Sequence, residues 1–423
     1  MTTQNTLLEM LSINGLTHDG RGVGHFEGKT IFVNDAVPGD IVTAKITKHH
    51  DNFDEADCLE IKTPSPERVN PFCSVYKECG GCQLQHLSLD AQRYWKNKNF
   101  ITQLTQSVDA QQCKTAEPMI GDDTHYRRRT RLTLVISKKD KVARLGFKQK
   151  SSNDVVDIDH CPVLTEGLNQ AIQESKPALL EQASRAYKEV TLVEADNGIF
   201  NTFPSKESAE ETLNQAQPYY TLNATSTPLK ITFPADGFIQ INQSLNEQMI
   251  AQALDWLELQ PEHKVLDLFC GVGNFTLPIA QQVQSTVGIE GEQILVETAS
   301  QNAKQNALAS VNFYKGDLFD EVTPKPWFKK QKYDRILLDP GRQGAFNLSK
   351  TLGKLKAHII VYVSCNAATL IRDIKELEKQ GYRLTKAGMI DMFPHTTHTE
   401  VMVQLSRTHK AIKKPKSRPT FKI

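Results

Sequence analysis

A chain of 423 residues is longer than one hydrophobic core usually organises, so we expect two or three domains. Its 50 lysines and arginines nearly balance its 49 aspartates and glutamates, and the formal charge of +1 excludes the uniformly basic character of many nucleic-acid binders. No apolar run is long enough to span a bilayer and the start lacks a secretory signal, so we expect a cytoplasmic protein with no membrane partner. We infer no obligate protein partner from the sequence.

Basic residues gather in three places along the chain. These are Arg127 to Arg131, Lys138 to Lys141, and a tail from Arg407 to Lys422 that holds no acidic residue. Such runs fit contact with phosphates. A solvated face or a solubilising tail accounts for each of them equally well.

Residues 7 to 63 alternate apolar and polar positions between glycine-containing turns. This pattern predicts short strands that form a small antiparallel barrel of the OB type, a fold that often binds nucleic acid. The proline-containing segment 63–71 marks a boundary, so we place the first domain at 1–64.

Three cysteines lie within ten residues soon after this boundary. Cys73, Cys79 and Cys82 form the pattern C-x5-C-G-G-C, and Cys161 is a fourth candidate. Disulfides are not expected in a cytoplasmic protein, and four thiolates hold either a tetrahedral zinc or a cubane iron–sulfur cluster. Spacing leaves both open, although zinc ribbons usually supply two C-x2-C pairs and this chain has one.

The middle and the end of the chain differ in rhythm. Helical spacing predicts a helix over 88–106, and strands with one helix near 164–188 follow, so we expect a central α+β domain over 65–235 that carries the cysteines. From about residue 244 helices and strands alternate. This predicts a doubly wound, mostly parallel α/β domain over 236–423, with its ligand at the carboxyl ends of the strands.

The segment VLDLFCGVGNFTLPIA begins at residue 265 and predicts a strand, a glycine turn and a helix. Gly271 and Gly273 let a ligand approach the backbone. A dinucleotide fingerprint is the alternative, but Thr276 stands where that motif has its third glycine.

Acidic residues end the strands that follow. Glu290 is placed to hold ribose hydroxyls, Asp317 to meet an adenine amino group, and Asp339 ends the fourth strand. This order resembles the class I S-adenosylmethionine-dependent methyltransferases. The resemblance implies a Rossmann-like fold and S-adenosylmethionine as the cofactor.

Cys365 directly follows the predicted strand HIIVYVS, at the edge of the sheet where the glycine turn lies. Polar residues flank it, although a lone cysteine is more often a buried structural residue. A thiolate that adds to carbon 6 of uracil makes carbon 5 nucleophilic, and a base must later remove the carbon 5 proton. Cys365 and Glu400 suit these two roles, with His395 and His398 as lower-ranked rivals of Glu400.

The segments LDPGRQGA, VSCNAATL and the one that contains Glu400 resemble the signature of the RNA uracil-C5 methyltransferases. In that family the cysteine is the nucleophile and the glutamate accepts the proton. The family often has proline or alanine where this chain has Gly341. The stretch GFIQINQSLNEQM also resembles the family, and the resemblance implies cofactor contacts at Gln240, Phe269, Asn274, Glu290, Asp317 and Asp339.

The cysteine pattern and the H-C-P at Cys161 resemble the ribosomal branch of this family, in which four such cysteines hold a 4Fe–4S cluster. The stretch GRGVGHFEGKTIFVNDAVPGDIVTAKI resembles a TRAM domain. Together these resemblances imply 23S ribosomal RNA as the substrate. Methylation of uracil in transfer RNA or at another ribosomal site, methylation of cytosine, and a non-catalytic RNA-binding assembly factor are the alternatives.

Overall fold

The computed structural model describes residues 6–186, 188–202, 217–319, 326–329 and 332–407. The chain divides into two compact units. The first holds Met1–Gln103, Glu117–Ile250 and Met389–Glu400, and the second holds Leu104–Ala116, Ala251–Gly388 and Val401–Ile423. The domain boundaries after residues 64 and 235 stay a prediction, and the basic tail beyond Arg407 lies outside the described residues.

The N-terminal strands close into a barrel. They are β1 (Leu7–Leu16), β2 (Gly22–Phe26), β3 (Lys29–Asn34), β4 (Ile41–His49) and β5 (Phe53–Thr63), in the order β1-β2-β3-β5-β4. Alternate side chains such as Leu11, Ile31 and Val42 fill the interior, as the period of two predicts. The predicted barrel is confirmed with one difference: β3 and β5 pair in parallel.

The rest of the first unit mixes helices with an antiparallel sheet. The sheet has the order β11-β10-β7-β8-β9, and helix α2 (Glu166–Glu181) packs Leu168 and Ile172 against it. Helix α1 (Leu89–Ser107) begins one residue after the predicted start, and β12 (Tyr219–Leu222) pairs with β13 (Leu229–Thr232). The sheet strands are β7 (Arg129–Ile136), β8 (Ala143–Lys148), β9 (Val155–Asp157), β10 (Lys188–Ala195) and β11 (Gly198–Thr202).

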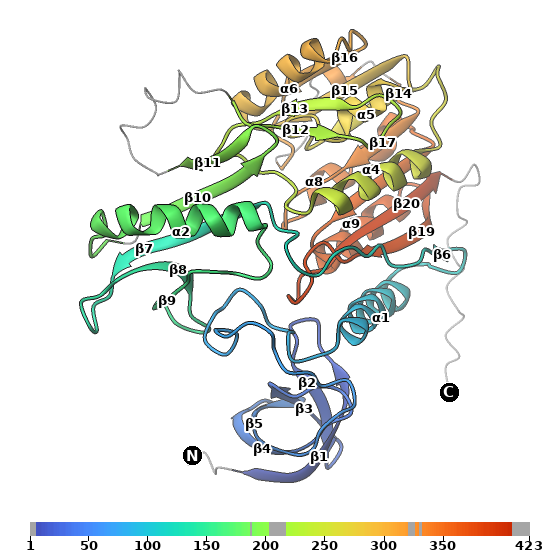
Figure 1. Ribbon diagram of the computed structural model, residues 1–423. Coiled ribbons are helices and arrows are strands. Elements are labelled where there is room, and N and C mark those ends of the chain that lie inside the picture. Colours follow the sequence, from blue (N-terminus) through green and yellow to red (C-terminus); the bar gives the residue numbers. More distant parts are fainter. Residues whose placement is uncertain (1–5, 187, 203–216, 320–325, 330–331, 408–423) are drawn as a thin grey trace, which may run out of the picture. The chain divides into compact units, whose positions relative to one another are not determined.

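The second unit is the predicted α/β sheet, with the strand order β16-β15-β14-β17-β18-β20-β19-β6. Its first five strands are parallel, whereas β20 runs antiparallel to β18. Helices α5 and α6 pack on β15 and β16, and α9 packs on β18 (Figure 1). The strands are β6 (Lys114–Thr115), β14 (Lys264–Leu268), β15 (Ser285–Glu290), β16 (Val311–Lys315), β17 (Arg335–Leu338), β18 (Ile359–Ser364), β19 (Tyr382–Ile390) and β20 (Glu400–Arg407). The helices are α4 (Gln243–Leu257), α5 (Thr276–Ala280), α6 (Gln293–Gln305), α7 (Pro326–Lys329), α8 (Phe346–Ser349), the 3-10 helix η2 (Leu352–Leu355) and α9 (Ala367–Glu378).

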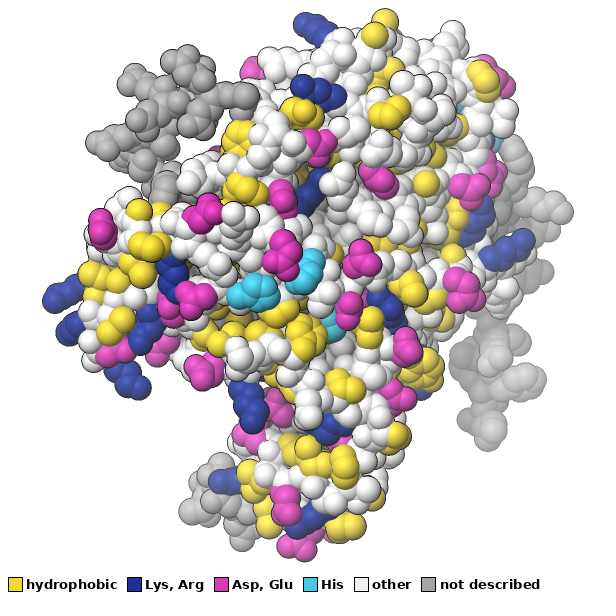
Figure 2. Space-filling view, viewed as in Figure 1, with side chains coloured by type: hydrophobic (Ala, Val, Ile, Leu, Met, Phe, Trp, Pro, Cys, Tyr) yellow, Lys and Arg dark blue, Asp and Glu magenta, His cyan; other side chains and the backbone are white. Residues whose placement is uncertain are grey.

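The surface carries both signs of charge. Basic and acidic side chains are interspersed over the face shown in Figure 2. Within the described part of the chain, no helix combines the length and the apolar character that a bilayer crossing requires.

Candidate active site and cysteine group

The carboxyl ends of three neighbouring strands bring predicted site residues to one edge of the sheet. Leu268 of β14 lies opposite Leu338 of β17, which in turn lies opposite Tyr362 of β18. The residues that directly follow these positions therefore reach the same edge. The order of the strands reverses between β14 and β17, which is where ligands of doubly wound sheets bind.

The turn after β14 has the shape that the glycines predicted. Phe269, Gly271 and Gly273 all have positive φ angles, of 67°, 53° and 97°. A Cβ atom added to Gly271 would meet nothing within 4 Å, so the backbone faces open space at this point. A ligand can therefore approach the main chain directly, and α5 begins at Thr276 just beyond it. Asn274 lies in the same turn and is half-buried.

Glu290 is the last residue of β15, and its carboxylate is tied to the glycine turn. Oε2 accepts a hydrogen bond from the Gly271 N–H at 3.0 Å, and Oε1 accepts from the N–H groups of Gly291 and Glu292 at 2.6 Å and 3.2 Å. Such charge-assisted bonds fix the carboxylate in one orientation.

An aromatic pair lies beside this turn. The rings of Phe269 and Phe319 have centroids 5.2 Å apart, and Phe319 is 43% exposed. The Asp317 carboxylate accepts from the Phe319 N–H at 2.9 Å. Phe319 was not predicted, because nothing around it in the sequence distinguishes it from an ordinary exposed residue.

Two further carboxyl groups lie near the turn. Asp267 in β14 is fully buried and accepts from the Thr276 hydroxyl. Burial, together with the charges of Asp339 and Glu290, raises the pKa of Asp267 to about 8. Loss of hydration also raises the pKa of Asp339. Asp267 therefore keeps its proton near neutral pH and supports the turn from the interior; it is an addition to the residues predicted from the sequence.

Cys365 lies where β18 turns into α9. It is half-buried and follows Ser364, whose hydroxyl oxygen accepts from the Asn366 N–H at 3.1 Å. Asn366 caps α9 by accepting from the N–H groups of Ala368 and Thr369, and it donates to the carbonyl oxygen of Arg342 at 3.1 Å. The polar neighbours that marked this cysteine in the sequence therefore fix the turn that presents it.

Glu400 and Gln240 belong to the first unit. Glu400 is the first residue of β20 and is 4% exposed. It directly precedes Val401, which lies opposite Ser364 in the β18–β20 pair. Gln240 is also buried, and its main-chain carbonyl accepts from Arg128 at 3.1 Å.

The basic run near residue 128 is only partly a surface feature. Arg128 is 4% exposed, and its guanidinium lies 4.4 Å from the ring centroid of Tyr220. Arg131 is exposed and pairs with Glu189. The hypothesis of phosphate contact is therefore wrong for Arg128, which packs in the interior.

The four predicted cysteine ligands belong to one neighbourhood of the first unit. Cys82 and Cys161 pack against the same buried side chains, which are Tyr126, Val163 and Ile241. Burial, together with the nearby Cys161, Cys79 and Cys73, raises the pKa of the Cys82 thiol to about 12.

A backbone N–H group is directed at the sulfur atom of Cys79. The Sγ atom of Cys79 accepts from the Gly81 N–H at 3.4 Å. Such N–H groups are typical of thiolates that hold iron–sulfur clusters. The Leu164 N–H donates to the main-chain carbonyl of Cys161 at 3.0 Å. Four thiols are a chemically suitable donor set for a metal centre.

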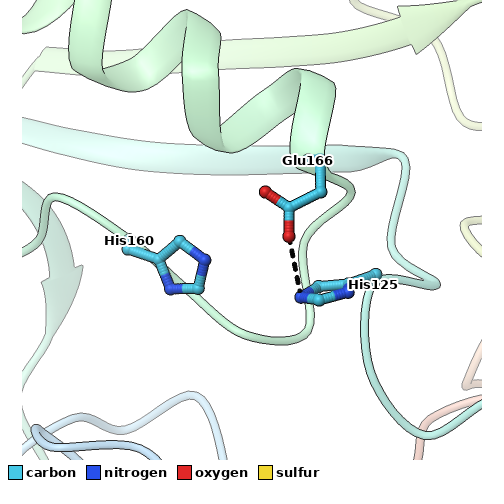
Figure 3. Close-up of side chains that lie close together, drawn as sticks. All are labelled: His125, His160 and Glu166. Carbon is cyan, nitrogen blue, oxygen red and sulfur yellow. Dashed lines mark ion pairs between the residues drawn. The ribbon is translucent and has the colours of Figure 1, made fainter.

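A second group of metal-ligating side chains lies beside the Cys161 loop. The ligand atoms of His125, His160 and Glu166 all lie within 4.8 Å of one another, and His125 pairs with Glu166 at 3.1 Å (Figure 3). The main-chain N–H of His125 also donates to the main-chain carbonyl of Pro162 at 2.9 Å. All three side chains are exposed, and the exposed ion pair joins His125 to Glu166 at the start of α2.

Comparison with known proteins agrees with this geometry. Residues 210–408 match the family described as tRNA (Uracil-5-)-methyltransferase, and residues 10–59 match the TRAM domain. The crystal structure of Pyrococcus abyssi tRNA (uracil-54, C5)-methyltransferase in complex with S-adenosyl-L-homocysteine shares the fold, with a TM-score of 0.69 and 24% identity over 94% of this chain and 100% of that one.

Two relatives are similar over nearly the whole chain. The 23S rRNA (uracil(1939)-C(5))-methyltransferase RlmD of Shewanella piezotolerans is 41% identical over 93% of this chain and 94% of its own length. The protein of the same name from Vibrio cholerae is 38% identical over 95% of this chain and 96% of its own. The chain therefore belongs to the RNA uracil-C5 methyltransferase family.

Proposed function

We propose that this protein transfers a methyl group from S-adenosylmethionine to carbon 5 of a uracil in 23S ribosomal RNA, at the position that its relatives' name gives as 1939. The observation that carries the proposal is the shared sheet edge, where Cys365 and the glycine turn follow the carboxyl ends of β18 and β14. A ribosomal RNA substrate implies a cytoplasmic enzyme. The three-part organisation, with boundaries after residues 64 and 235, belongs to the same proposal.

Cys365 begins the reaction. Its thiolate adds to carbon 6 of the uracil, and the electron pair of the C5=C6 bond moves to form an enolate, which makes carbon 5 nucleophilic. The positive end of the α9 dipole lies beside Cys365 and favours negative charge on its sulfur. The uracil must leave its stack to reach this sulfur.

Glu400 ends the reaction. After carbon 5 has taken the methyl group, the Glu400 carboxylate removes the carbon 5 proton, the C5=C6 bond forms again, and the sulfur leaves carbon 6 as a thiolate. The rival base His395 is held by Gln92, and burial lowers its pKa. These observations favour Glu400 over His395.

The proposed cofactor site uses the carboxyl ends of the strands. Bound S-adenosylmethionine supplies an electrophilic methyl group on its sulfonium. The open space over Gly271 and the fixed carboxylate of Glu290 fit the amino-acid and ribose parts, and the Phe269 ring fits the adenine. We assign the contacts to Gln240, Phe269, Asn274, Glu290, Asp317 and Asp339.

We also propose that Cys73, Cys79, Cys82 and Cys161 hold a 4Fe–4S cluster. The shared packing of Cys82 and Cys161 and the Gly81 N–H directed at the sulfur of Cys79 support this ligand set. The proposed methyl transfer needs no electron from the cluster. Iron and acid-labile sulfide of about four atoms each per chain, measured after anaerobic purification, would support it. Stoichiometric zinc would contradict it.

The test of the function is incubation with a 23S RNA fragment and methyl-labelled cofactor, followed by digestion and mass mapping of the modified nucleotide. We expect 5-methyluridine from the wild-type protein and none from Cys365→Ala. A transfer RNA transcript serves as the competing substrate. Preference for the transfer RNA would contradict the ribosomal assignment, and a labelled cytosine would contradict the base assignment. Full activity of Cys365→Ala would refute the mechanism.

A further inference from the structure

The loop that leads to the proposed base is held by residues 72–84, which contain Cys73, Cys79 and Cys82 and are called the cysteine-bearing segment here. This loop runs over residues 391–399, between β19 and β20, and Glu400 directly follows it. Although β19 and β20 belong to the α/β sheet, Met389–Glu400 belongs to the same compact unit as the cysteines. The position of Glu400 therefore depends on contacts made far from the cofactor turn in sequence.

Main-chain bonds attach the loop directly after the third cysteine. The N–H groups of Gln83 and Leu84 both donate to the carbonyl oxygen of His395, each at 2.9 Å. The Gln83 side chain makes a second link, because its Oε1 accepts from the Thr397 N–H at 3.4 Å while its Nε2 donates to the carbonyl of Gly80 at 2.8 Å. Gly80 lies between Cys79 and Cys82, and Thr397 lies three residues before Glu400.

Gln92 on α1 attaches the same loop from a second element. It is 1% exposed, and its Oε1 accepts from the His395 N–H at 3.0 Å. Its Nε2 donates to the carbonyls of Leu84 and Leu87 at 3.0 Å and 2.8 Å. One buried amide therefore joins the segment after the cysteines to the loop.

His395 itself shows that the loop is held in a costly conformation. Its φ angle is 65°, in the left-handed region that a residue with a side chain rarely adopts. Its main-chain N–H donates to Gln92 on α1, and its main-chain carbonyl accepts from the cysteine-bearing segment. Its ring packs edge-on against Phe72, with 4.9 Å between the centroids. Phe72 directly precedes Cys73. Strain of this kind persists only where surrounding contacts determine it, and it is common at functional sites.

We infer that Gln83 and Gln92 are positioning residues for the release step: they hold loop 391–399 so that the Glu400 carboxylate reaches the carbon 5 proton. The inference rests on the proposed role of Glu400. In this step the proton passes to Glu400, the C5–H electron pair forms the C5=C6 bond, and the C6–S pair returns to the sulfur of Cys365. The cysteine group thereby acts on the reaction through position, with no change in its own oxidation state.

The consequence is specific to one step. Loss of these contacts should leave addition of Cys365 and methyl transfer unchanged, because neither needs Glu400. Release should slow by about tenfold to a hundredfold, since a displacement of roughly 1 Å in a reacting group costs up to that factor. The methylated covalent adduct should therefore accumulate.

The experiment is a single-turnover reaction of the full-length, cluster-containing enzyme with a 23S RNA fragment and methyl-labelled cofactor. Denaturing gels separate label bound to protein from label in free RNA at each time. The variants are Gln83→Ala, Gln92→Leu, and Gln83→Glu, which keeps the acceptor for the Thr397 N–H. Gln170→Ala, an exposed glutamine on α2, is the matched control. Iron content and thermal unfolding are measured for each variant.

We expect Gln83→Ala and Gln92→Leu to accumulate protein-bound label at the wild-type rate and to release it slowly, while Gln83→Glu and the control behave as wild type. Glu400→Gln is run in parallel and should hold the adduct almost completely. If Glu400→Gln holds the adduct and both glutamine variants release it normally, the inference is wrong and the proposed function stands. The same conclusion follows if methyl transfer and release slow equally in both glutamine variants. If Glu400→Gln releases it normally, the role of Glu400 is wrong as well.

Discussion

Asp267 gives a prediction about stability that follows from its burial. The folded protein raises the pKa of this carboxyl from its ordinary value of 3.8 to about 8. Between these two values the folded chain keeps a proton that the unfolded chain has lost. The free energy of unfolding should therefore fall as pH rises through this window, by about 1.4 kcal/mol for each pH unit.

Substitution of Asp267 by Asn isolates this contribution. The amide cannot titrate, and its oxygen still accepts from the Thr276 hydroxyl. The Asp267 Oδ1 atom has no hydrogen-bond partner in the interior, so the amide nitrogen placed there adds a constant cost that does not vary with pH. The difference in stability between variant and wild type should therefore change by about 3 kcal/mol between about pH 5.5 and about pH 7.5, in favour of the variant at the higher pH.

Thermal unfolding without cofactor measures this difference. For a domain of roughly 150–250 residues, such as the predicted catalytic domain, about 3 kcal/mol corresponds to a change of roughly 6–12 °C in the difference between the melting temperatures of variant and wild type. The comparison of two proteins at each pH cancels the titration of groups that they share. Melting curves of wild type and Asp267→Asn that run parallel across the window would refute the reasoning, because they would show that the carboxyl titrates alike in both states.

Three other substitutions test separate parts of the structure. Asp391→Asn removes the charge that buried Lys96 contacts at 2.8 Å; we expect a loss of about 3 kcal/mol in the free energy of unfolding, measured by thermal melting, and an unchanged melting temperature would contradict it. Phe319→Ala removes the ring beside Phe269 and should weaken S-adenosylhomocysteine binding about fivefold in calorimetric titration. Glu290→Gln replaces a fixed carboxylate with a weaker acceptor and should weaken the same binding about tenfold, and equal affinity would exclude its proposed contact.

Local patterns made the sheet and its edge predictable. A buried strand, two glycines with positive φ angles and a helix follow one another within 265–280. The apolar run, the glycines and the helical residues are consecutive in the sequence, so the turn could be predicted from this segment alone. The strand ends at Glu290 and Asp339 could be placed because each acidic residue follows an apolar run. The barrel was equally visible from its period of two, whereas the parallel pairing of β3 and β5 depends on how the barrel closes and has no local pattern.

Contacts between distant segments were not predictable. Gln92 and His395 are 303 residues apart in the chain, yet each completes the hydrogen bonds of the other. His395 appeared in the sequence only as a rival base, because a histidine in a polar segment does not reveal which backbone groups it must satisfy. Asp267 was missed for a related reason: an acidic residue inside an apolar strand gives no sign of the charges that surround it once the sheet has formed.

The position of Glu400 is determined from two sides. It is the last residue of one compact unit, and Val401, the first of the next segment, is fixed opposite Ser364 by strand pairing. On its other side the chain is fixed by His395 and Thr397, which are bonded to the cysteine-bearing segment. Under the proposed role of Glu400, a side chain held at both ends loses little conformational entropy when it meets its substrate, so preorganisation of this loop would contribute directly to the rate of proton removal. A disturbance on either side should therefore appear first at the release step.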